Sequence, residues 1–120
     1  MQPFVHQALF TLAADGDETG PGGAITLALC GSWQYPPPCP LAPHQTAVER
    51  SVDQNHIRLR TVFACDPDDE ERVRRVIEDA LAREHLTGPD GVERTWSVVS
   101  RGPGALRPDE RDLAVRLAAG

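Results

Sequence analysis

The sequence contains no lysine, and its 12 basic residues, all arginines, are outnumbered by 18 acidic residues. The formal net charge is −6. Binding to a phosphate backbone or to an anionic membrane surface requires an excess of positive charge, which this composition lacks. Neither nucleic acid nor a membrane is therefore expected as a partner.

Signals for targeting are also missing. The start of the chain, Met1 to His6, has no basic segment followed by an apolar run, and no stretch reaches membrane-spanning length. We therefore expect a cytoplasmic protein. In that reducing compartment, cysteines serve as free thiols, metal ligands or redox groups more often than as structural disulfides.

Several catalytic and cofactor motifs are absent. There is no serine-centred nucleophile elbow and no dinucleotide fingerprint, and the glycine-rich run 20–23 lies between two predicted strands rather than before a helix. Three cysteines are too few for the usual four-cysteine ligation of an iron–sulfur cluster. No internal repeat is present, and 120 residues fit one domain, 1–120.

Hydrophobic periodicity predicts four strands and two helices. The alternation of Ile25, Leu27 and Leu29 with smaller residues is typical of a strand. Asp66-Pro67 with acidic residues behind it is typical of a helix start. The predicted strands cover 4–13, 24–30, 56–64 and 92–100, and the predicted helices cover 67–85 and a last segment that opens at 107–110.

These elements, in the order β-β-β-α-β-α, predict an α+β fold. The simplest architecture is a two-layer sandwich in which a four-stranded mixed sheet carries both helices on one face. The predicted strand order is 3-2-1-4, with the fourth strand parallel to the third. Residues 31–55 are expected to form a long proline-rich loop. Arg58 and Arg60 alternate with apolar residues, so we expect them on a solvated face of the third strand.

The predicted topology gathers residues of the metal-binding types at one end of the sheet. Two cysteines and all four histidines are expected at this rim: His6, Cys30, Cys39, His44, His56 and His85. Zinc takes about four thiolate or imidazole ligands in a tetrahedron.

Cys30, Cys39, His44 and His6 are the predicted zinc ligands. Their spacing, Cys-x₈-Cys-x₄-His with a distant histidine, differs from the compact zinc-finger patterns. We expect Zn²⁺ to fix the loop 31–55 against the sheet, in a small domain with a binding or accessory role. The alternative is that Cys30 is a small buried side chain and that Cys39 and His44 are ordinary loop residues.

Two other functions are compatible with the same residues. A site with three protein ligands and an open position would make the chain a metal-dependent enzyme, with His56 or His85 transferring protons. A metal-free interaction module would instead present Trp33 and Tyr35 to a protein partner from the loop 31–55. The same two aromatic residues could equally cover an open sheet edge.

Cys65 precedes the first predicted helix, where the helix dipole can lower the pKa of a thiol. The acidic residues that follow it oppose this effect, because they destabilise a further negative charge. We therefore expect Cys65 to be a buried structural cysteine rather than a nucleophile.

Overall fold

The computed structural model describes residues 1–12, 19–30, 42–50, 56–87 and 91–119. Its helices and strands are, in chain order, β1 (Gln2–Leu12), α1 (Thr19–Cys30), β2 (His44–Arg50), β3 (Ile57–Cys65), α2 (Glu70–Ala82), β4 (His85–Thr87), β5 (Glu93–Gly104) and α3 (Arg111–Ala118). Single 3₁₀ turns, Pro67–Asp69 and Pro108–Glu110, lead directly into α2 and α3. Among these residues, no helix is long and apolar enough to cross a membrane.

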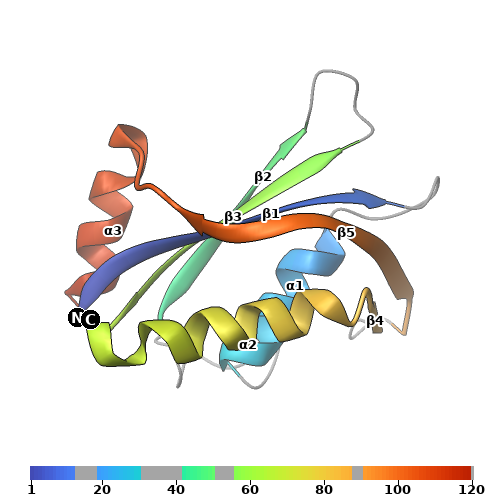
Figure 1. The fold of residues 1–120 in the computed structure, drawn as a ribbon, viewed down its shortest axis with the longest axis horizontal. Coiled ribbons are helices and arrows are strands. Elements are labelled where there is room, and N and C mark those ends of the chain that lie inside the picture. The colour runs from blue at the N-terminus through green and yellow to red at the C-terminus, as the bar shows by residue number, and fades with distance from the viewer. Residues whose placement is uncertain (13–18, 31–41, 51–55, 88–90, 120) are drawn as a thin grey trace.

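The strands form one curled, five-stranded sheet with the order β2-β3-β1-β5-β4, and every neighbouring pair is antiparallel. The helices α1 and α2 lie together on one side of this sheet, and α3 lies beside the start of β1 (Figure 1). Apart from the short β4, the order β1-α1-β2-β3-α2-β5 interleaves two β-α-β units, which is the connectivity of ferredoxin-like domains.

The predicted four-stranded mixed sheet is wrong, although the α+β class is correct. Residues 24–30, predicted as a strand, form the second half of α1, and residues 44–50, predicted as loop, form the edge strand β2. The strand β4 was not predicted. The third and fourth predicted strands, now β3 and β5, run in the same direction but do not pair, because β1 lies between them.

The main core lies between the sheet and the helices α1 and α2. The register of β1 and β3 places Ala8 opposite Leu59 and Phe10 opposite Ile57, and these side chains face the two helices. Both helices cover them with residues at helical spacing. The buried helix side chains include Pro21, Ala24, Ile25 and Leu29 on α1 and Val73, Ile77, Ala80 and Leu81 on α2.

Close approach between α1 and β5 depends on Gly20. A Cβ atom at this position would lie 3.0 Å from the Cβ of Arg94 and 3.3 Å from the ring of Trp96. The Trp96 ring is buried, and its Nε1 donates a hydrogen bond of 2.9 Å to the carbonyl of Leu81. The indole of Trp96 therefore links β5 to the end of α2, and its ring packs against Gly20 of α1.

A second, smaller core lies on the opposite face of the sheet. Here Val5 of β1 and Val62 of β3 are covered by Ala114, with Leu113 and Leu117 of the same helix packed beside them. Because α3 has only eight residues, it covers only part of this face. The uncovered part, called the open face below, carries the candidate site.

Candidate functional site

The open face carries two adjoining cavities of about 250 Å³ each. Leu9 of β1 and Arg58 of β3 line both of them. Toward β5 the walls are formed by Gln7, Ser100 and Gly102, and toward β2 they are formed by Glu49, Arg50 and Arg107. We call the two cavities together the open-face groove.

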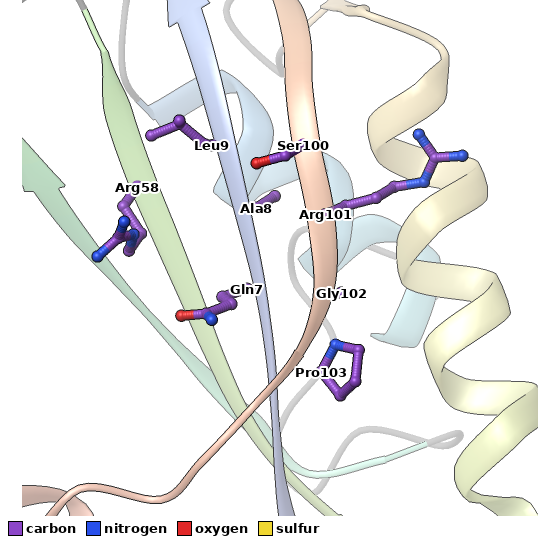
Figure 2. A pocket seen from close by; sticks show the side chains of 8 residues that line it. All are labelled: Gln7, Ala8, Leu9, Arg58, Ser100, Arg101, Gly102 and Pro103. Carbon is purple, nitrogen blue, oxygen red and sulfur yellow. The ribbon is translucent and has the colours of Figure 1, made fainter.

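Side chains from three strands converge on this groove. Figure 2 shows Gln7, Leu9 and Arg58 on the same side of the sheet as Ser100, whereas the side chain of Arg101 extends toward α2. The Arg101 guanidinium reaches Glu78 on that helix, with Nε 3.2 Å from Oε1. Arg101 therefore borders the groove without offering its charge to it.

Arg60, two residues after Arg58 on β3, is only 3% exposed and does not line the groove. Its Nε and Nη2 donate to the two carboxylate oxygens of Glu110, at 3.0 and 2.7 Å, and this pairing lowers the pKa of Glu110. Nη2 also donates to the carbonyl of Ala105 at 2.8 Å. The prediction of a solvated face is wrong for Arg60, because the segment leading into α3 folds over it, and correct for the exposed Arg58.

The same guanidinium orients the amide of Gln7. Arg60 Nη1 lies 3.0 Å from Gln7 Oε1, and a guanidinium has only donors, so the amide oxygen must face Arg60. The amide nitrogen of Gln7 has no partner among the residues that the structure describes. A buried ion pair thus leaves a hydrogen-bond donor directed away from it, at the wall of the groove.

A β-bulge shapes the wall formed by β5. Leu9 pairs with Ser100 and Phe10 pairs with Val98, so Val99 has no partner on β1 and is 53% exposed. Beyond the bulge, a Cβ on Gly102 would have no atom within 4 Å. The backbone of β5 is therefore open to a ligand beside the hydroxyl of Ser100.

One guanidinium of the groove, that of Arg58, makes no direct contact with a carboxylate in the described part of the chain, although its charge acts on nearby Glu49. Glu49 lies opposite Arg58 in the strand register, but its Oε2 accepts a hydrogen bond of 2.6 Å from Arg107, which lowers the pKa of Glu49. Arg58 itself makes no hydrogen bond or ion pair with any described residue. Its guanidinium, the Gln7 amide and the Ser100 hydroxyl are three donors around one space, an arrangement suited to an anionic acceptor.

The predicted zinc ligands are only partly described. Cys30 is the last residue of α1, and Cys39 lies outside the described residues, as do Trp33 and Tyr35. Among the described residues, no group of three or more histidine, cysteine, aspartate or glutamate side chains is placed to hold a metal ion. The site was expected from a topology that the structure does not have.

His6 and His44 lie against different helices. His6 is buried, with Nδ1 3.0 Å from Arg74 Nη1 of α2 and Nε2 3.8 Å from Glu78 Oε2. Because arginine can only donate, Nδ1 is the acceptor and the proton lies on Nε2, which has no hydrogen-bond partner among the described residues. Burial, helped by the Arg74 charge, lowers the pKa of His6.

His44 begins β2 and faces α1. Its Nε2 lies 3.3 Å from Thr26 Oγ1, and its Nδ1 lies 3.3 Å from the carbonyl of Ala42. Burial lowers the pKa of His44 as well. Cys30 follows Thr26 by four residues, so the two positions neighbour each other on one face of α1.

The expected gathering of all four histidines at one rim is wrong. His44 lies on β2 and His85 on β4, and these are the two opposite edges of the sheet. His56 directly precedes β3. Cys65, by contrast, is a buried cysteine as predicted, and burial together with the nearby carboxylates Asp69, Glu70 and Asp66 raises the pKa of its thiol.

Comparison with known proteins adds no relative. No protein-family model matches the chain, and no curated protein and no solved structure matches it either.

Proposed function

We propose that this protein is a binding module that holds a small organic monocarboxylate in the open-face groove. The observation that carries the proposal is the guanidinium of Arg58, which has no hydrogen bond or ion pair with a described residue, beside the amide nitrogen of Gln7 and the hydroxyl of Ser100 at the same cavity. A planar guanidinium matches a carboxylate in a two-oxygen, two-donor geometry. The apolar side chain of Leu9 adjoins this charge and suits the carbon end of such a ligand.

The balance of charge favours a monocarboxylate over a phosphate. Arg107 and Arg60 each hydrogen-bond a glutamate, and Arg50 has an interaction of its own, so Arg58 is the groove arginine without a hydrogen bond or ion pair to a described residue. A phosphate dianion would be incompletely neutralised by one cation in a chain whose net charge is −6. Binding rather than catalysis is proposed because, among the described groove residues, Ser100 has no general base beside it.

Titration of the ¹⁵N-labelled protein with sodium acetate and sodium glycolate, followed by amide chemical shifts, tests this function. We expect saturable shifts in segments 7–9, 57–59 and 99–102, with dissociation constants of about 1–10 mM, equivalent to roughly 3–4 kcal/mol. Arg58→Met should abolish the shifts, and Arg58→Lys should weaken binding because the two-donor geometry is lost. Arg72→Met, which removes an exposed arginine of α2, is the matched control.

Each contrary outcome has a definite meaning. Unchanged binding by Arg58→Met, or shifts that never saturate, would reject the groove as a carboxylate site. Tighter binding of inorganic phosphate than of acetate would reject the ligand class.

The zinc-binding role expected from the sequence is retained as a second proposal. It is favoured by the position of His44, whose half-buried imidazole lies beside Thr26, one helical turn before Cys30, and whose lowered pKa favours the neutral form that a metal ligand requires. Elemental analysis of the purified protein should find one zinc per chain, lost in Cys30→Ser, Cys39→Ser and His44→Gln.

Of the proposed zinc ligands, His6 has one ring nitrogen already occupied, because Arg74 donates to its Nδ1. Retention of zinc by His6→Gln would remove it from the set, and absence of zinc from the wild-type protein would reject the proposal. A zinc ion with a bound water would support the metal-dependent enzyme instead.

A further inference from the structure

Another cavity, of about 240 Å³, lies on the other side of the sheet between α1, the end of α2 and β4. Most of its walls are apolar. The helices contribute Ala24, Leu27, Ala28 and Ala80, and β4 contributes Leu86. The cavity exists because alanines stand where the two helices face each other, since larger side chains at these positions would occupy the space.

The rim of this cavity carries an arginine and a histidine. Arg83 and His85 line it, both are exposed, and neither makes a hydrogen bond or ion pair with any residue that the structure describes. The carboxylate of the intervening Glu84 is engaged elsewhere, because its Oε2 accepts a hydrogen bond of 2.8 Å from the backbone N–H of Val98. An apolar interior thus opens at a rim where the guanidinium of Arg83 has no hydrogen bond or ion pair with a described residue.

An unusual backbone conformation places Arg83 and His85 at the same rim. Glu84 has a φ of 59°, the only positive φ of a non-glycine residue in the described part of the chain. Its N–H donates to the carbonyl of Leu81 at 3.2 Å, and its carbonyl accepts from the N–H of Trp96 at 3.0 Å. A left-handed conformation costs a non-glycine residue free energy and persists only where contacts hold it, often at ligand sites.

The end of α2 does not oppose an anion at this rim. Unsatisfied carbonyls at a helix C-terminus carry partial negative charge. The carbonyl of Leu81 in this last turn accepts from both the Glu84 N–H and the Trp96 indole, at 3.2 and 2.9 Å. Part of that negative charge is therefore already met by donors from the turn and from β5.

We infer that this cavity binds a short-chain aliphatic carboxylate, with the hydrocarbon between α1 and α2 and the carboxylate at Arg83 and His85. At about 30 Å³ for each water-sized group, the cavity accommodates a ligand of about eight non-hydrogen atoms, which is the size of hexanoate. The site is separate from the open-face groove, which lies on the opposite face of the sheet. It does not depend on the function proposed for that groove.

Titration of the ¹⁵N-labelled protein with sodium hexanoate and with 1-hexanol tests the inference. Hexanoate should shift amides in segments 24–28 and 80–86, and hexanol, which lacks the charge, should bind about tenfold more weakly or worse. Arg83→Met should reduce hexanoate affinity to that of hexanol. Arg72→Met serves as the matched arginine control, and Arg58→Met should leave these shifts unchanged.

A cavity-filling variant separates the apolar contribution from the charge. Ala28→Leu should block both ligands, whereas Ala82→Leu, the same substitution at an exposed position of α2, should block neither. Hexanoate shifts confined to segments 7–9 and 99–102 would overturn the inference, as would wild-type binding by Arg83→Met. Equal affinities for hexanoate and hexanol would reject the role of the rim.

Discussion

Removing the carboxylate of Glu110 is expected to release α3 from the sheet. Arg60 is 3% exposed, and two of its hydrogen bonds, at 2.7 and 3.0 Å, end on this carboxylate. In Glu110→Ala the guanidinium would keep only two acceptors, Gln7 Oε1 and the carbonyl of Ala105. Breaking a buried ion pair on one side costs about 3–5 kcal/mol.

The lower end of that range applies here, because the side chain of Glu110 is 12% exposed and water can reach the vacated position. We expect Glu110→Ala to lose about 3 kcal/mol of the free energy of unfolding, a large share of the roughly 5–15 kcal/mol typical of a domain. Urea denaturation followed by circular dichroism measures this loss. Hydrogen exchange should show the amides of α3 exchanging before those of α2.

Two further variants separate the buried pair from other contributions. Glu71→Ala breaks an exposed pair with Arg75, 3.4 Å apart, and should cost under about 0.5 kcal/mol. The double variant Arg60→Met/Glu110→Leu replaces both charges with apolar groups and should lie within about 1 kcal/mol of the wild type. A loss below about 1 kcal/mol in Glu110→Ala would show that this pair does not anchor α3.

Three further predictions concern buried positions. Burial lowers the pKa of His6 below its ordinary value of about 6.5, so the folded state binds fewer protons than the unfolded chain. In urea denaturation, the contribution of neutral His6 to the free energy of unfolding should be complete above about pH 6.5. Below about pH 6.5 the free energy of unfolding should fall by up to about 1.4 kcal/mol per pH unit, and the fall should be less steep in His6→Gln. Burial raises the pKa of the Cys65 thiol, so iodoacetamide should alkylate it far more slowly in the native than in the urea-unfolded protein, and equal rates by mass spectrometry would contradict the buried placement. Gly20→Ala should lower the melting temperature by about 4 °C or more because its Cβ would lie 3.3 Å from the Trp96 ring, whereas Gly102→Ala should stay within about 2 °C; equal melting temperatures would exclude close packing at Gly20.

The elements with one-sided hydrophobic patterns could be predicted from the sequence. The strand β3, the helix α2 and the strand β5 overlap their predicted ranges closely, because polar and apolar residues alternate there with a single period. The segment 24–30 could not be assigned in this way. Nearly all of its residues are small or apolar, so they satisfy a period of two and a period of 3.6 equally well, and the glycines before it hid the start of α1.

The edge strand β2 was missed for the opposite reason. Most of its residues are polar and only partly covered, so its pattern resembles that of a loop, and its pairing depends on β3 rather than on its own sequence.

Only one feature of the candidate site, the polar side of β3, could be predicted from the sequence. The alternation of Arg58 and Arg60 correctly predicted a polar side of β3. Arg58 is exposed and Arg60 is buried because Glu110, 50 residues after Arg60, folds back onto Arg60 alone. The clustering of Cys30 and Cys39 directed attention to the loop instead. A position on a strand indicates which face a side chain occupies, and only the packing of other elements determines whether that face meets solvent.

The bulge at Val99 decides which residues of β5 belong to which side of the protein. In an uninterrupted strand, every second residue shares a face, so Trp96 and Ser100 would both face the helices or both face the groove. The extra residue changes the parity, which allows the indole to enter the core while Ser100 and Gly102 face the groove. Deleting Val99 would remove the bulge and leave Ser100 opposite Leu9 and Arg101 opposite Ala8, on their present faces. If Val99 were instead paired with Leu9, the rest of β5 would exchange faces and Arg101 would turn toward the groove. The unpaired position of Val99 therefore keeps the charge of Arg101 out of the candidate site.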